Sequence, residues 1–246
     1  MNAALRSEWL KQCTTRTMLG VLTAMLGTVS LAAVIHLLGF GVALIDQRTE
    51  QLGIMLDIGV GLGLIFAAVN GAIAITSEFR YGTIRANLVR RPKRAETLLA
   101  KVATQLVIGA VLAAVAASSA IGLAAIFLRI RDIDLQLTNS DVVRLILGGA
   151  FGGAMFALIG LVVGTLIRNQ VPVVVGTLVW TLFIETLLRG GVPDVGKFAP
   201  GSLARTLAGQ TTAAMSSPWT AGTILVALVG VALLAAHTAF TRRDVG

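Results

Sequence analysis

Side chains suited to chemistry are scarce in this sequence. It contains one cysteine, Cys13, and two histidines, His36 and His237. A single cysteine cannot form an intramolecular disulfide, and its place in a basic segment before the first apolar run indicates a reduced, cytosolic thiol. Two histidines without a cluster of Cys, Asp or Glu supply too few ligands for a structural zinc site or a two-metal centre. We therefore expect neither cysteine chemistry nor a metal.

A few polar side chains fall within long apolar runs. Asp57, His36 and Asn70 are of this kind, and an ionisable group inside a membrane helix is a functional candidate because it is costly to leave unpaired in hydrocarbon. Asp57 and Asn70 are candidates for a translocation path. The alternatives are interfacial placement for Asp57 and His36, and a hydrogen bond to a neighbouring helix for Asn70. Glu185 precedes Arg189 by four residues, which favours a structural ion pair.

The segment 191–198 comes close to a phosphate-binding loop. Gly191, Gly196 and Lys197 have the spacing of that motif, but Phe198 stands where a Ser or Thr hydroxyl must reach magnesium. Pro193 interrupts the segment, and no strand is expected before it. No pair of polar groups is spaced for acid–base or nucleophilic catalysis. We therefore predict that the chain is not an enzyme and that energy for any work comes from a partner or an ion gradient.

The elements that must position these residues are long and apolar. The 246 residues are 56% hydrophobic and 13% charged, with a mean hydropathy of +0.86, which excludes an ordinary soluble domain. About 20 helical residues cross a bilayer, and the runs lack the alternating polarity of barrel strands. We predict an all-α integral membrane protein with six transmembrane helices. The six apolar runs are 18–44, 53–76, 102–128, 143–167, 171–188 and 220–240.

Lys and Arg residues indicate the orientation of these helices. Of the 20, 13 fall in residues 1–17, 77–101, 168–170 and the C-terminal tail. Because cytoplasmic loops carry an excess of Lys and Arg, we expect both termini in the cytoplasm, a cytoplasmic loop at 77–101 and an external loop at 189–219. The net charge of +8 is then loop charge rather than a sign of nucleic-acid binding.

Residues 1–17 are interpreted as an N-terminal amphipathic helix. Leu5, Trp9 and Cys13 recur at four-residue spacing, and charged residues surround them. Such a helix suits the surface of the membrane lipids, with Trp9 as its interfacial anchor. A plain juxtamembrane extension is the alternative.

Small residues predict close helix packing. Four pairs of glycines have four-residue spacing, which places each pair on one helix face and allows two backbones to approach. These faces pack either within one bundle or between subunits, and the sequence leaves both open. The pairs are Gly59 and Gly63, Gly148 and Gly152, Gly149 and Gly153, and Gly160 and Gly164.

The segment that follows the second apolar run is the most informative. Glu78-Phe79-Arg80-Tyr81-Gly82-Thr83 combines two aromatics, opposite charges and a glycine that permits a sharp turn. Topology explains the positive charges of the loop but not Phe79 and Tyr81 in a short polar stretch. This pattern is expected if the turn inserts into a groove on a cytosolic protein.

At these residues the chain resembles the permease subunits of type-2 ATP-binding cassette (ABC-2) transporters, in particular the small bacterial exporters with six membrane helices. The resemblance rests on residues 7–11, on Glu78–Thr83, on the stretch from Arg91 to Lys101 and on the basic tail 242–244. It implies that Glu78–Thr83 forms a coupling helix docking on a separately encoded cytosolic ATPase, which binds the ATP and magnesium. It also implies a second permease subunit, identical or different, and a location in the bacterial cytoplasmic membrane.

The resemblance further implies export of a compound by alternating access. A path of Ala, Gly, Val and Leu with little fixed charge favours an amphipathic, lipid-like or drug-like cargo over an inorganic ion. Residues 190–218, which include the amphipathic stretch 202–209, are the expected counterpart of the family's partly helical external hairpin. Two alternatives stay open, namely an ion-coupled transporter that uses Asp57, His36 or Glu185, and a membrane scaffold or sensor subunit that transports nothing.

Overall fold

The described residues of the computed structural model, 2–39, 48–83, 94–210 and 217–242, form helices joined by short turns, with no strand among them. Six helical segments are long and apolar enough to cross a membrane, so the prediction of an all-helical chain with six such helices is confirmed. Their bounds are Arg16–Gly39 (α2), Arg48–Arg80 (α3, η1 and α4 in succession), Arg94–Ile130 (α6), Asn139–Ile167 (α7), Gln170–Gly191 (α8, η2 and α9) and Pro218–Arg242 (α12).

Three shorter helices complete the described part of the chain. They are α1 (Asn2–Thr14), α10 (Pro193–Gly196) and α11 (Pro200–Leu207). Parts of four predicted segments lie outside the described residues: 40–44 of the first apolar run, 84–93 of the loop 77–101, 211–216 of the loop 189–219, and 243–246 of the tail. In the rest of the loop 77–101, α4 continues to Arg80 and α6 already begins at Arg94.

Local sequence explains where several helices begin and end. Thr138 caps α7 through a reciprocal pair of hydrogen bonds with Asp141, and Arg168 ends the helix in the left-handed conformation, with φ of 59°. Pro193, Pro200 and Pro218 each stand at the first residue of a helix, where the missing backbone N–H costs no hydrogen bond.

Two of the membrane-length helices contain a π-helical stretch. In the second, η1 (Leu56–Gly61) separates α3 (Arg48–Met55) from α4 (Leu62–Arg80). In the fifth, η2 (Trp180–Ile184) separates α8 (Gln170–Val179) from α9 (Glu185–Gly191). Such stretches widen the helix by a residue per turn and occur frequently at functional sites.

Helix α7 is the centre of the bundle. Of its most apolar stretch 67% is buried, against 11% for the α8–η2–α9 segment, and it packs against α4, α6, α11 and α12. Its glycines allow this. A Cβ at Gly160 would overlap the carbonyl oxygen of Ala68 in α4, and one at Gly71 in α4 would overlap that of Ala157 in α7.

The four predicted glycine pairs all pack within this chain. Gly59 and Gly63 face alanines of α6, and the glycines of α7 face α4, α6, α11 or the side chain of Val60. Of the two alternatives left open by the sequence, packing within one bundle is therefore the one observed.

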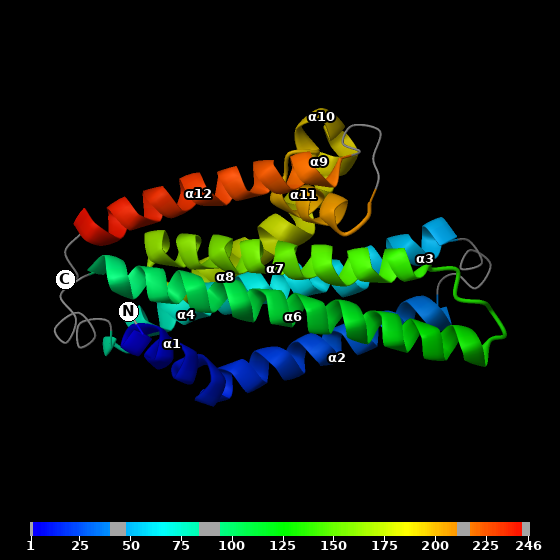
Figure 1. Ribbon diagram of the computed structural model, residues 1–246, viewed down its shortest axis with the longest axis horizontal. Coiled ribbons are helices and arrows are strands. Elements are labelled where there is room, and N and C mark those ends of the chain that lie inside the picture. Colours follow the sequence, from blue (N-terminus) through cyan, green and yellow to red (C-terminus); the bar gives the residue numbers. More distant parts are fainter. Residues whose placement is uncertain (1, 40–47, 84–93, 211–216, 243–246) are drawn as a thin grey trace.

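The ends of the bundle are distinct. Helix α1 and the C-terminal end of α12 lie at the same end, as six crossings require, and α3 lies at the opposite end (Figure 1). Helices α9, α10 and α11 form a compact group beside the first turns of α12 (Figure 1).

Candidate functional site

At the α1 end of the bundle, four charged side chains from three helices form one cluster. Lys101 Nζ in α6 donates to Glu8 Oε2 in α1 at 2.7 Å and to Glu78 Oε1 in α4 at 2.6 Å. Lys11 Nζ donates to Glu8 Oε1 at 2.8 Å and to Glu78 Oε1 at 2.9 Å. We call Glu8, Lys11, Glu78 and Lys101 the four-charge cluster. It joins α1, α4 and α6 and is electrically neutral.

The cluster is largely out of solvent. The side chain of Lys101 is 2% exposed and that of Glu78 is 8% exposed, whereas that of Lys11 remains 39% exposed. Burial of the Glu8 carboxyl opposes its ionisation, but the ammonium groups of Lys101 and Lys11 outweigh this and hold its pKa below the ordinary 4.5. For Lys11 burial also opposes the charge, and the bonds to Glu8 and Glu78 nevertheless raise its pKa above the ordinary 10.5.

The structure divides the predicted coupling residues into two groups. Glu78 points inward to the four-charge cluster, and Phe79 packs against the core beneath the Arg168 guanidinium, 5.2 Å from the ring centroid. Arg80, Tyr81, Gly82 and Thr83 are exposed, and the Tyr81 residue is 71% exposed. Gly82 has a φ of +67°, the turn conformation for which glycine is suited. The outward surface of this turn is thus Arg80 to Thr83.

Sequence reasoning missed the partners of Glu78. The spacing of Glu8 and Lys11, three residues apart on a helix, is a visible signal for one of the ion pairs. No local pattern connects either residue with Lys101, whose charge the sequence pattern assigns to the loop 77–101. Trp9, the predicted interfacial anchor, is 44% exposed on α1 and lies next to Glu8 in the chain, so its ring is available to a lipid surface.

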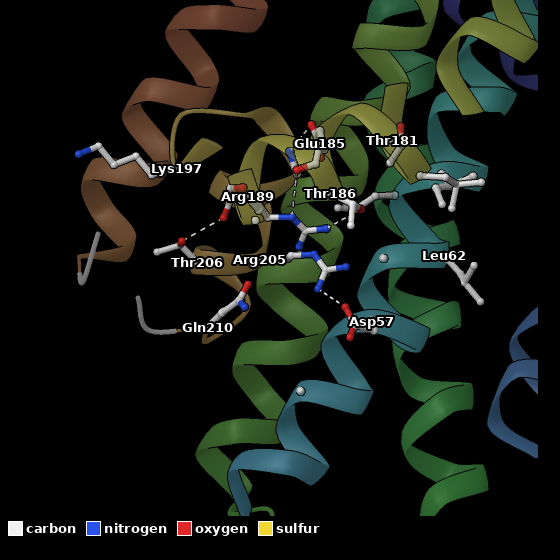
Figure 2. Close-up of a pocket in the computed structure, with 18 of the residues that line it drawn as sticks. Asp57, Leu62, Thr181, Glu185, Thr186, Arg189, Lys197, Arg205, Thr206 and Gln210 are labelled. Carbon is white, nitrogen blue, oxygen red and sulfur yellow. Dashed lines mark hydrogen bonds and ion pairs between the residues drawn. The ribbon is translucent and has the colours of Figure 1, made fainter. Parts of the chain in front are cut away.

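A cavity of about 670 Å³ lies between η1, the η2–α9 segment and α11. We call it the arginine cavity, because Arg189 of α9 and Arg205 of α11 project into it beside one another (Figure 2). Arg205 donates to the carboxylate of Asp57 in η1. The Asp57 side chain is 63% exposed, whereas that of Arg205 is 12% exposed. The sequence-predicted path residue Asp57 therefore forms part of a cavity wall.

The contacts of the Glu185 carboxylate differ from the predicted ion pair with Arg189. Its Oε1 accepts the backbone N–H of Gly201 at 2.9 Å and the indole N–H of Trp180 at 3.3 Å, and the residue is 2% exposed. Arg189 donates instead to the backbone carbonyl oxygen of Glu185, at 3.4 Å, and to the Thr186 hydroxyl, at 3.3 Å. The side-chain ion pair expected from the spacing of Glu185 and Arg189 is thus not formed.

Asn70 does not line the arginine cavity. It is buried, and its Nδ2 donates to Gln105 Oε1 of α6 at 3.0 Å. Of the two readings of Asn70, the bond to a neighbouring helix is the one observed. His36 is exposed, with its Nδ1 3.3 Å from the carbonyl oxygen of Ala32 one turn earlier.

The segment 191–198 has no phosphate-loop geometry. Residues Pro193–Gly196 form the short helix α10, and Lys197 reaches Asp194 at 3.4 Å. Within the described part of the chain, no three His, Cys, Asp or Glu side chains gather as metal ligands.

Comparison with known proteins adds no family to this picture. The chain matches no protein-family model and no curated protein sequence at a significant level.

Proposed function

We propose that this chain is the membrane-spanning permease subunit of an ABC-2 type transporter. It works in the bacterial cytoplasmic membrane with a cytosolic ATPase and a second permease subunit, and it exports an amphipathic, lipid-like or drug-like compound. One observation carries the proposal: the exposed turn Arg80–Thr83 begins two residues after Glu78, and Glu78 connects the end of α4 to α1 and α6 through the four-charge cluster.

This geometry suits a contact that must transmit force. Tyr81 offers a large exposed ring, and the Arg80 guanidinium lies 5.7 Å from the centroid of that ring. Aromatic and arginine side chains supply much of the binding energy at protein interfaces. Because the residues just before this turn are buried and paired, a push on Tyr81 is passed to three helices at once rather than absorbed by one flexible side chain.

Helix packing carries the movement farther into the bundle. Helix α4 packs closely along α7 through Gly71 and Gly160, where backbone meets backbone. A displacement of α4 therefore moves the central helix, since no intervening side chains are present to yield. In the proposed cycle, ATP binding closes the ATPases, and the helices then reopen toward the other side of the membrane.

Two other features fit the ABC-2 architecture. Helix α1 lies at the bundle end that holds the proposed coupling turn, as a connecting helix would. Helices α10 and α11 lie between the fifth and sixth long helices, where the family's external hairpin is expected.

The test is co-purification of the full chain from native membranes in mild detergent, followed by ATPase and transport assays. A cytosolic ATPase is expected to co-purify. The variants Tyr81→Ala and Arg80→Ala are expected to lose the ATPase or to uncouple its activity from transport, with normal membrane insertion. Arg6→Ala is the matched control, because Arg6 is an exposed arginine on α1, outside the turn. A chain that purifies alone and transports under an ion gradient would overturn the proposal in favour of an ion-coupled carrier.

A further inference from the structure

The arginine cavity is where the helical geometry of this chain is most irregular. The two π-helical stretches of the described residues both contribute to its wall: η1 provides Asp57 and Gly61, and η2 provides Thr181 and Leu182. These stretches come from different membrane-length helices and are more than 100 residues apart in sequence. Because π-helical turns are costly relative to α-helix and are frequent at functional sites, their meeting at one cavity indicates a site rather than a packing defect.

The charges in the cavity favour an anion. Arg189 and Arg205 come from separate helices, yet their guanidinium groups lie side by side and interact electrostatically (Figure 2). Among the described residues, Arg189 donates to neutral oxygens, those of the Glu185 carbonyl and the Thr186 hydroxyl. The Glu185 carboxylate accepts hydrogen bonds from Gly201 and Trp180 and also interacts electrostatically with both arginines. Within the described residues, the pair of guanidinium groups therefore has one hydrogen bond to a carboxylate, that of Arg205 to Asp57.

Backbone positions without side chains make this arrangement fit. A Cβ at Gly61 would lie 3.1 Å from Nη2 of Arg205, and a Cβ at Gly201 would overlap the Glu185 carboxylate. Both glycines line the cavity. The close approach of the charged groups to the backbone thus depends on these two residues.

Ser202 is an independent indication that the cavity binds a polar group. It lines the cavity and is 9% exposed, and its buried hydroxyl has no hydrogen-bond partner within the described residues. Buried hydroxyl groups are nearly always hydrogen-bonded, because an unsatisfied one costs free energy. A bound oxyanion between the arginines and Ser202 would accept this hydrogen bond.

Another part of the cavity wall is apolar, although the polar side chains of Lys197, Thr206 and Gln210 also line the cavity. Leu62, Leu64 and Ile65 of α4 and Leu182 of η2 face it. A volume of about 670 Å³ lies within the usual range for small-molecule sites, which combine apolar walls with a few fixed polar groups. It has room for a charged head and the first part of a chain.

We propose that the arginine cavity binds a phosphate-bearing amphiphile. Arg189, Arg205 and the Ser202 hydroxyl bind the phosphate oxygens, since guanidinium groups present paired donors that match phosphate geometry. The leucine and isoleucine wall holds the first part of the acyl chain. Asp57 pairs with Arg205 when no ligand is bound, and on binding it moves aside into solvent, for which its exposed position is suited. This site stands whether or not the chain is driven by an ATPase.

The test uses Trp180 as a reporter, because its indole N–H bonds to Glu185 at the edge of the cavity. The chain has three tryptophans, so Trp9→Phe with Trp219→Phe leaves Trp180 alone. The full chain is placed in bilayers that contain a minor fraction of brominated phosphatidylglycerol or, separately, of brominated phosphatidylcholine. Stronger quenching of Trp180 by the brominated phosphatidylglycerol is expected at equal fractions.

Variants in the same background separate the site from general lipid contact. Arg189→Gln and Arg205→Gln are each expected to weaken phosphatidylglycerol binding about tenfold, the effect of one lost hydrogen bond to a charged group. Asp57→Asn is expected to strengthen it by removing the competing carboxylate. Arg144→Gln, which removes an exposed arginine of α7 outside the cavity, is expected to change nothing.

Three results would overturn the proposal. The first is equal quenching by the two lipids in the starting protein. The second is an equal loss of binding in Arg144→Gln and Arg205→Gln, which would indicate attraction by net charge alone. The third is displacement of the lipid by inorganic phosphate at equal affinity, which would identify the ligand as free phosphate and leave the apolar wall without a role.

Discussion

Lys101 Nζ lies 2.6 Å from Glu78 Oε1, and this ion pair bridges the end of α4 and the beginning of α6. The two residues lie on either side of the connection 84–93. Because Lys101 also binds Glu8 of α1 at 2.7 Å, the flanks of the connection and the N-terminal helix are fixed to one another. A buried cation with two carboxylate partners leaves little freedom for these helices to separate independently.

The first prediction concerns removal of that cation. Lys101→Met leaves Glu8 and Glu78 buried beside each other with Lys11 alone, and breaking a buried ion pair by removing one partner costs about 3–5 kcal/mol. We expect faster hydrogen exchange of α1 amides and a lower melting temperature for the purified chain. Lys197→Met is the matched control, because the carboxylate partner of Lys197, Asp194, is 93% exposed. Equal effects of the two variants would contradict a special role for the cluster.

The second prediction concerns pH. The pKa of Glu8 is lowered in the folded state, so its contribution to stability is complete above its ordinary value of 4.5 and is lost as pH falls through the lowered pKa. The pKa of Lys11 is raised, so its contribution is complete below 10.5 and is lost as pH rises through the raised pKa. We therefore expect α1 to be held most firmly between these limits and to be released by acid.

Hydrogen exchange or a spin label on α1 would measure this release. In Glu8→Gln the acid transition of α1 is expected to become weaker, because the carboxyl group whose pKa Lys101 and Lys11 lower is gone. A transition of unchanged size in this variant would assign the pH dependence to another group.

The long helices could be predicted because the backbone hydrogen bonds that stabilise them form between residues close in sequence. Backbone groups in hydrocarbon must be satisfied within the helix, so a run of about 20 apolar residues has few other choices. Close helix packing at Gly160 and Gly164 also followed from their spacing, although whether the partner helix belongs to the same chain did not. The apolar runs thus identified the six helices, and the glycine spacing identified the packing face of several of them.

The candidate sites depended on long-range contacts, which periodicity does not report. Asp57 meets Arg205 across 148 residues, and Glu8 meets Lys101 across 93. The prediction of an ion pair from the local spacing of Glu185 and Arg189 was wrong, because the Glu185 carboxylate accepts the backbone N–H of Gly201 instead. The π-helical stretches could not be recognised from the sequence, because a π-helical turn requires no particular residue type.

The third prediction tests the glycine contacts of α7. An alanine at a helical glycine normally gains up to about 1 kcal/mol in helix propensity. At Gly160 the added Cβ would overlap the backbone of Ala68, which cannot move without shifting α4. We expect Gly160→Ala to lower stability by about 1–3 kcal/mol, as overpacking does.

Gly122 of α6 is the matched position, because a Cβ there meets nothing within 4 Å. Thermal unfolding of the two variants in detergent checks the contrast. Gly122→Ala is expected to be neutral or stabilising, and a similar loss in both would mean that helix α7 does not approach α4 as closely as described.

The fourth prediction separates packing from transport at Asn70. Its amide donates to Gln105 at 3.0 Å, and both residues are buried between α4 and α6. Asn70→Leu leaves the Gln105 amide without its partner, which costs about 1–3 kcal/mol, whereas replacing both partners by apolar groups is nearly neutral. We therefore expect Asn70→Leu with Gln105→Leu to recover most of the stability lost in the single variant.

Transport in the same pair of variants distinguishes the two roles of Asn70. If the bond to Gln105 is its whole function, the double variant recovers transport together with stability. If the Asn70 amide also contacts cargo, the double variant is stable but remains impaired, because no substitution at Gln105 restores a polar group to the path. A double-mutant cycle measured by thermal unfolding, with transport assayed on the same preparations, gives both quantities.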